Sequence, residues 1–225
     1  MEISAGKKHV AIIERCMMSE AGLRHLFASP VMNSYHFHFF NSHKAFVEAQ
    51  KKTIFFSVIY SLSSMRELRR ECLLCLHALS LTNPGIQRIV LADDDREARL
   101  VSRLSPSRLH GVLSKSASLP ILLGHIGTLL GETRRVNENV VNHWYVSQNR
   151  TLSPTERAIL QCMTRGLSMP EIAVQLERNI KTIRAHKFNA MAKLGVNSDV
   201  GLLNAADILT WVPAAAALKG PQSAA

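Results

Sequence analysis

Cationic side chains gather without an acidic neighbour towards the C-terminal end of the chain. Residues 178–193 contain no aspartate or glutamate, and their cations are Arg178, Lys181, Arg184, Lys187 and Lys193. Such a run suits a polyanion, and an arginine in a major groove can donate two hydrogen bonds to guanine O6 and N7. The alternative is that these cations form the solvated face of an amphipathic helix, which is the usual meaning of a charge run.

A helix, a short turn and a second helix are expected to carry this run. Apolar spacing predicts a short amphipathic helix over residues 169–176, a polar turn over 177–179 and a longer helix over 180–194. Ala173 is small, which lets the two helices cross closely. This arrangement can place the start of the second helix in a DNA major groove.

Two further helices are predicted around this pair. Ser153 can cap a helix that starts with Pro154, and Glu156 stands three residues after the cap, as in a capping box. Gly166 is expected to end this helix, and a last helix is predicted over residues 198–209. The C-terminal part is therefore expected to be an all-α domain of four helices.

The N-terminal part alternates between strand-like and helix-like runs. The expected strands are 9–13, 35–40, 53–60, 88–92 and 109–113, and the expected helices are 17–27, 44–50, 64–81, 94–104 and 119–132. Strands that alternate with helices favour an α/β doubly wound domain with a five-stranded parallel sheet. In such a domain the chemistry lies beyond the carboxyl ends of the strands.

Composition narrows the class of protein. The formal net charge of +10 favours a polyanionic partner, and no signal peptide or membrane-spanning run is recognisable, so we expect a cytoplasmic protein and no membrane partner. Cys72 and Cys75 form a lone CxxC without obvious further ligands, so no metal is expected. An enzyme built on the α/β domain is a weak alternative, because GxGxxG, GxxxxGKS/T and GxSxG are all absent.

The C-terminal pattern resembles the LuxR/FixJ helix-turn-helix family over about 60 residues. The residues that carry the resemblance are Leu152, Glu156, Ile159, Leu160, Gly166, Glu171, Ile172, Ala173, Leu176, Lys181, Thr182, Ile183, His186, Lys193, Leu194, Gly195 and Val196. Residues 179–183 and 191–196 are similar to the Rcs branch of that family. The alternation of elements before them resembles a response-regulator receiver domain.

The resemblance implies a division of the chain into four segments. We expect a receiver-like domain over residues 1–132, a linker over 133–150, a LuxR-type DNA-binding domain over 151–212 and a flexible tail over 213–225.

The resemblance also places the outward arc of the second helix in the major groove. The residues expected to bind DNA are Lys181, Thr182, Arg184, Ala185 and Lys187. Arg184 suits guanine, Ala185 admits the backbone closely, and the remaining three suit phosphates. His186 matches a family position and suits either a structural role or a groove contact.

Receivers of this type hold Mg²⁺ with an acidic pair after the first strand, and an aspartate at the end of the third strand accepts the phosphoryl group. The corresponding positions in this chain are Glu14, Arg15, Ser61, Ala92 and Lys115. Only Lys115 fits the family pattern, since a guanidinium stands where a metal belongs and a hydroxyl replaces the acceptor carboxylate. We therefore expect a degenerate receiver that is not phosphorylated on aspartate, and no cofactor.

The expected function is regulation of transcription through double-stranded DNA. The resemblance implies an activator that forms a heterodimer with an RcsB-like response regulator, contacts RNA polymerase, associates with the nucleoid and controls a β-glucoside utilisation operon. The alternative is an interaction module that titrates a partner regulator without reading DNA. The residues alone do not separate a homodimer from a heterodimer.

Overall fold

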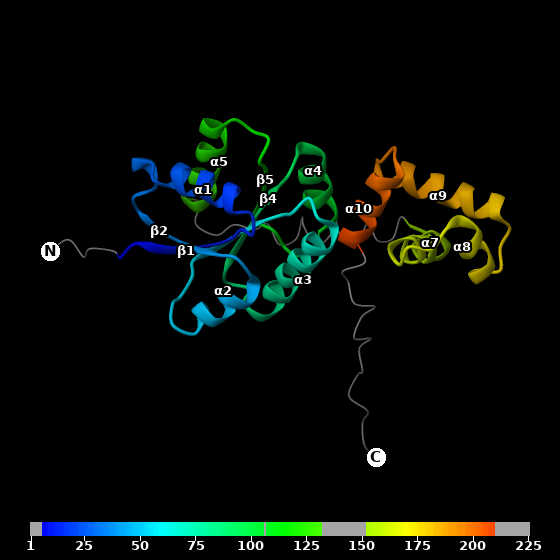
Figure 1. Cartoon of the computed structure of the whole chain (residues 1–225), viewed down its shortest axis with the longest axis horizontal. Coiled ribbons are helices and arrows are strands. Elements are labelled where there is room, and N and C mark those ends of the chain that lie inside the picture. The colour runs from blue at the N-terminus through cyan, green and yellow to red at the C-terminus, as the bar shows by residue number, and fades with distance from the viewer. Residues whose placement is uncertain (1–5, 106, 132–151, 210–225) are drawn as a thin grey trace, which may run out of the picture. The chain divides into compact units, whose positions relative to one another are not determined.

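The computed structural model describes residues 6–105, 107–131 and 152–209, and the chain divides into two compact units, residues 1–144 and 145–225. Each unit is described by itself, with the element labels of Figure 1. The predicted linker over 133–150 and the predicted tail over 213–225 lie outside the described residues.

The first unit is built on a parallel sheet in the order β2-β1-β3-β4-β5. The strands are β1 Lys8–Ile13, β2 Tyr35–Phe40, β3 Ser57–Ser61, β4 Gln87–Ala92 and β5 Gly111–Ser114. The helices of this unit are α1 Met17–Phe27, the 3-10 turn η1 Pro30–Met32, α2 His43–Gln50, α3 Arg66–Thr82, α4 Asp95–Leu104 and α5 Leu119–Gly131. This order confirms the doubly wound α/β prediction, and the switch in strand order falls between β1 and β3.

Helices cover both faces of the sheet (Figure 1). On one face, Leu26 of α1 and Ile126 of α5 pack with the inward side chains of β1, β3 and β4 in one buried cluster. On the other side Figure 1 places α2 and α3, whose Phe46 and Leu76 are fully buried. Side chains of a strand alternate between faces, so strands covered on both sides read as continuous apolar runs, as in the buried residues of β3.

Two predicted strands begin later than their sequence suggests: β5 starts at Gly111 rather than at residue 109, and β3 shows the larger shift. The run 53–60 is rich in β-branched and aromatic residues, yet β3 starts at Ser57. The Thr53 N–H donates to the Ala49 carbonyl at the end of α2, so the chain is still leaving that helix, and Phe55 packs against Phe46 instead. The strand propensity of residues 53–60 correctly indicated an apolar segment, but it did not indicate which backbone groups of the segment hydrogen-bond to α2.

The second unit consists, over its described residues, of four helices: α7 Pro154–Thr164, α8 Met169–Gln175, α9 Ile180–Leu194 and α10 Asp199–Leu209. They match the four predicted helices to within a residue or two at each end. Ile159, Ile172, Ile183 and Leu202, one from each helix, are fully buried, so each helix contributes its apolar face to one core.

A buried carboxylate joins the first helix of this unit to the end of the third. The side chain of Ser153 accepts a hydrogen bond from the Glu156 N–H, and Glu156 accepts one from the Ser153 N–H, which confirms the predicted capping box. Glu156 is only 2% exposed, and both of its oxygens also accept from Lys193 Nζ at 2.9–3.0 Å. Burial raises the pKa of the Glu156 carboxyl, but the Lys193 and Ser153 donors outweigh it and hold that pKa below its ordinary value.

We predict that Glu156→Gln destabilises the second unit by about 1–3 kcal/mol at neutral pH, because it removes a charged partner from a buried hydrogen-bonded pair. Since the folded-state pKa is lowered, this stabilisation is present above the ordinary pKa of 4.5 and is lost as the pH falls through the folded value. The free energy of unfolding, measured by urea titration with hydrogen exchange of α7 and α9 peptides, should therefore differ most at pH 7 and converge in acid. Glu177→Gln, at an exposed glutamate, is the control. A difference that stays constant down to pH 3 would contradict the assignment.

Candidate functional site

The exposed side of α9 carries most of the residues predicted to bind DNA. Lys181, Thr182, Arg184 and Ala185 are all exposed, while Ile183 between them is fully buried. The helix therefore presents its first two turns outward and keeps its apolar face in the core. This arrangement agrees with the outward arc expected from the sequence.

The turn before α9 fixes where that helix begins. Glu177 has a positive φ of 51°, and the following Arg178 N–H donates to the Ala173 carbonyl, which closes the end of α8. Asn179 then caps α9, since its side chain accepts from the Lys181 N–H at 2.8 Å. At the other end Gly195 adopts a left-handed φ of 71°, a conformation that suits glycine at a helix terminus.

Lys187 does not share the environment of the other predicted DNA-binding residues. Its Nζ pairs with both carboxylate oxygens of Asp199 at 2.6–2.7 Å, and its side chain is only 13% exposed. Lys187 follows the buried Ile183 by four residues and precedes the buried Met191 by four, so it lies on the inner stripe of α9. From the sequence, we placed Lys187 on the outward arc. Its spacing of four residues from both Ile183 and Met191 is the local signal that would have indicated the inner stripe.

Lys193 is also paired within the unit, since its Nζ forms an ion pair with the buried Glu156, although the lysine side chain itself is 39% exposed. Among the described residues, the remaining cations of the run, Arg178, Lys181 and Arg184, have no ion-pair partner, and all three are exposed. The unneutralised positive charge is thus concentrated at the start of α9, where it suits an incoming phosphate chain.

Three more residues of α9, His186, Phe188 and Asn189, differ in their exposure to solvent. His186 is half-buried, beside the outward stripe rather than on it. Phe188 and Asn189 are exposed and were not among the predicted site residues. The signal for Phe188 was its position four residues after Arg184, which places both on one side of a helix.

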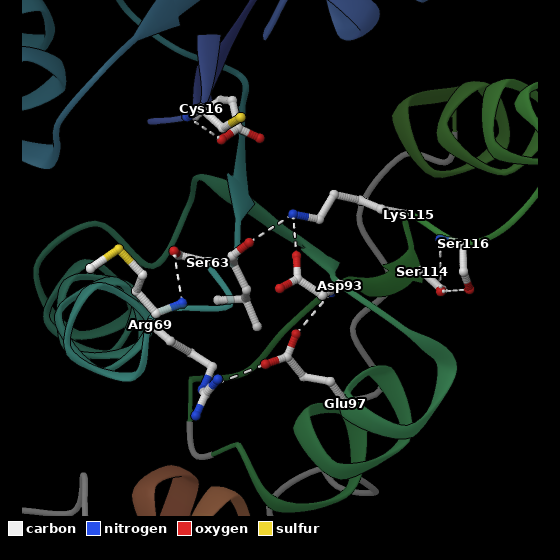
Figure 2. Close-up of polar contacts among 11 residues, drawn as sticks. Cys16, Ser63, Arg69, Asp93, Glu97, Ser114, Lys115 and Ser116 are labelled. Carbon is white, nitrogen blue, oxygen red and sulfur yellow. Dashed lines mark hydrogen bonds and ion pairs between the residues drawn. The ribbon is translucent and has the colours of Figure 1, made fainter. Parts of the chain in front are cut away.

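The carboxyl edge of the sheet holds the positions where a receiver performs its chemistry (Figure 2). Lys115, directly after β5, donates to the Leu62 carbonyl at 2.7 Å and pairs with Asp93 at 2.5 Å. Its backbone N–H donates to the carbonyl of the buried Ala92. Asp94, the first residue of the helix predicted over 94–104, instead caps α4 by accepting a hydrogen bond from the Glu97 N–H, and so takes no part in this pair.

Beneath Asp93 a buried ion pair joins α3 to α4. Glu97 accepts from the Asp93 N–H at 2.8 Å and lies 3.5 Å from Arg69, and both side chains of this pair are about one-tenth exposed. Figure 2 shows the chain of contacts from Lys115 through Asp93 and Glu97 to Arg69. Burial raises the pKa of the Glu97 carboxyl, while the Asp93 N–H and Arg69 offset part of that effect.

Two buried polar groups at this edge have no hydrogen-bond partner among the described residues. They are the Ser61 hydroxyl and one carboxylate oxygen of Glu14, and both residues line a cavity of about 170 Å³. The other Glu14 oxygen accepts from the Cys16 N–H at 2.8 Å, and Arg15 pairs with Glu71 on α3.

These residues do not fit a phosphorylation site with its Mg²⁺. The ion requires a set of oxygen ligands and the reaction requires a carboxylate nucleophile. Here Ser61, a hydroxyl residue, ends β3, where the acceptor was expected, and Arg15 and Lys115 place two cations beside Glu14 and Asp93. In the parts of the chain that the structure describes, no group of three His, Cys, Asp or Glu residues is placed to hold a metal ion, and no helix is long and apolar enough to cross a membrane.

Comparison with known proteins identifies the same two regions. Residues 150–206 match the family model of the bacterial regulatory proteins of the luxR family. The chain is 52% identical over 203 residues to the transcriptional activator protein BglJ of Escherichia coli K12, with 90% of each chain covered. It is also 44% identical over 66 residues to the transcriptional regulatory protein RcsB of Escherichia coli K12, which is 29% of this chain and 31% of RcsB.

Solved structures agree on the fold. The RcsB–DNA complex matches with a TM-score of 0.67 at 24% identity, over 91% of this chain and all of that chain. RcsB from Salmonella enterica serovar Typhimurium bound to the P1flhDC promoter gives the same TM-score, identity and coverage. The receiver-like fold and the helix-turn-helix domain are thereby confirmed. With its close likeness to an activator over nine-tenths of its length, the chain belongs to the LuxR family of bacterial regulatory proteins and is a transcriptional regulator of that type.

Proposed function

We propose that this protein is a transcriptional activator that reads DNA through α9 as the heterodimeric partner of an RcsB-like response regulator, without phosphorylation of its own receiver-like domain. The observation that carries the proposal is the division of charge on α9: Lys187 and Lys193 are neutralised inside the unit, while Lys181 and Arg184 stand exposed without an ion-pair partner among the described residues. The protein then acts on the nucleoid in the cytoplasm.

The residues proposed to contact DNA divide by chemistry. Arg184 reads a guanine, Ala185 allows close approach of the helix, and Lys181 and Thr182 bind phosphates. Lys187 contributes a phosphate contact only by exchanging its Asp199 carboxylate for DNA, which makes its role conditional on opening that ion pair. The half-buried His186 supports the helix from beside the groove face.

The proposal of a heterodimer draws on the relatives and on symmetry. The relative that covers most of this chain is named an activator, and RcsB shares the DNA-binding region. One helix-turn-helix module reads a single half-site, so regulators of this kind bind in pairs. A heterodimer with an RcsB-like protein requires an asymmetric operator. In this proposal one such operator belongs to a β-glucoside utilisation operon. The bound pair contacts RNA polymerase there.

The carboxyl edge of the sheet supports the proposed independence from phosphorylation. A receiver switches when its acceptor aspartate gains a charged group, whereas this chain has the Ser61 hydroxyl there and a Lys115 ammonium already paired with Asp93. The first unit then serves as a constant surface for the partner, and activity depends on the amounts of the two proteins.

The principal experiment mixes this chain with differently tagged RcsB of Escherichia coli and measures the mass of the complex in solution by light scattering, with and without duplex DNA. A one-to-one complex that shifts a duplex which neither protein shifts alone supports the proposal. The alternative, a module that titrates RcsB, predicts that the complex forms but releases the duplex.

Replacement of Arg184 tests base reading. Arg184→Ala should weaken binding to a cognate duplex by about 1–3 kcal/mol and relax the preference at one base pair, because a bidentate contact to guanine is lost. Lys181→Ala, the matched control on the same exposed side, should weaken binding to all sequences alike and lower the salt dependence by about one counterion. Fluorescence anisotropy at fixed salt measures both. Equal losses on cognate and random DNA for Arg184→Ala would show that it does not read bases.

Treatment with a small phosphodonor tests the receiver. The chain incubated with acetyl phosphate and Mg²⁺ should gain no hydroxylamine-labile phosphoryl group, because the acceptor position holds Ser61. Intact-mass spectrometry detects such an adduct, and RcsB treated in parallel is the positive control. A hydroxylamine-labile adduct on this chain would overturn the assignment.

A further inference from the structure

A large aromatic side chain stands in solvent on the DNA-binding helix. Phe188 of α9 is 63% exposed, although a phenyl ring normally lies in a core or an interface. Among the described residues of this unit, the other large hydrophobic side chains that are exposed are Val174 of α8 and Val200 of α10. Phe188 is therefore the one that shares a helix with the proposed DNA contacts.

Helical spacing places Phe188 in line with those contacts. It follows Lys181 by seven residues, Arg184 by four and Ala185 by three, and these separations bring side chains to one side of a helix. All four residues are exposed. The inner side of the same helix, which includes the buried Ile183, faces the core. The outward stripe of α9 thus continues past its cations and ends in an apolar ring.

We propose that Phe188 is a specificity-determining residue that packs against the C5-methyl group of a thymine in the major groove. This inference rests on the proposed function, since it requires α9 to lie in the groove. The rise of about 1.5 Å per residue puts Phe188 about 6 Å along the helix from Arg184, so it reaches a base pair one or two steps away. The thymine methyl is the apolar group that the major groove offers at such a position.

The chemistry of a phenyl ring disfavours guanine and cytosine as partners. A ring donates no hydrogen bond to guanine O6 or N7 and accepts none in its plane from the cytosine amino group, so it would strip water from these polar edges without replacing it. Against thymine it covers a methyl group that is otherwise in water. Arg184 and Phe188 together then favour guanine and thymine at neighbouring positions of one half-site.

The test removes the methyl group from the DNA and the ring from the protein. A preferred duplex is first selected from a random-sequence pool with the full-length chain and RcsB of Escherichia coli, and each thymine is then replaced singly by deoxyuridine. The unmodified protein should lose about fourfold in affinity at one thymine, the effect of one methyl-sized apolar group. Phe188→Ala should bind the thymine and deoxyuridine duplexes equally well, and Val174→Ala should retain the difference. Circular dichroism establishes that each variant is folded.

The outcomes distinguish the inference from the proposed function. A Phe188→Ala protein that keeps the full deoxyuridine penalty, or a protein with no thymine-sensitive position, overturns the role of Phe188 and leaves the Arg184 contact standing. Loss of RcsB assembly in Phe188→Ala, with unchanged discrimination on the DNA that is bound, assigns the ring to a protein interface and also overturns the inference. A protein pair that selects no sequence overturns the proposed function and the inference with it.

Discussion

The buried Glu156 carboxylate is the interaction on which the DNA-binding unit depends. It closes the start of α7 through the Ser153 N–H and holds the end of α9 through Lys193, so one side chain fixes the position of two helices. Replacement of Lys193 would leave the buried Glu156 carboxylate without its cationic partner, which costs more than an exposed ion pair contributes. With its last turn tied to α7, α9 can present its first turns to solvent without losing its place in the core.

The ion pairs within this unit also determine which positive charges remain available for DNA. Ion pairs within the unit engage Lys187 on the inner stripe and Lys193 at the helix end, so a count of cations along the sequence overstates the charge available to a ligand. What remains exposed is a short row, Lys181, Arg184 and the neutral Ala185, that continues to Phe188. Such a row combines phosphate attraction with one polar and one apolar contact to base edges.

In the receiver-like unit, by contrast, the charged side chains at the edge of the sheet are paired with one another. Lys115, Asp93, Glu97 and Arg69 form a connected chain from β5 to α3, and each charge has a neighbour of opposite sign or a hydrogen-bond donor. At the end of β3 stands Ser61, whose buried hydroxyl has no partner among the described residues. The sheet edge thus keeps the receiver-like architecture, while the charges of Lys115, Asp93, Glu97 and Arg69 are already paired.

Sequence reasoning predicted the elements well because each has local signals. Ser153 caps α7 as predicted, and the apolar spacing of α9 matches its buried face. It did not predict the ion pairs of α9, whose partners are distant in the sequence. The ion pairs of Lys187 with Asp199 and of Lys193 with Glu156 join residues 12 and 37 positions apart, and no local pattern announces them. Phe188 was missed for a different reason: its spacing was visible, but an apolar residue is ordinarily assigned to the core.

Methylation interference with dimethyl sulfate tests the central claim most directly, since the reagent modifies guanine N7 in the major groove and adenine N3 in the minor groove. On a duplex selected with this chain and its RcsB partner, modification of a guanine N7 in the half-site of this chain should block binding of the unmodified protein and have no effect on Arg184→Ala. Interference confined to adenine N3, or a guanine signal that persists in Arg184→Ala, would contradict the placement of α9 in the major groove.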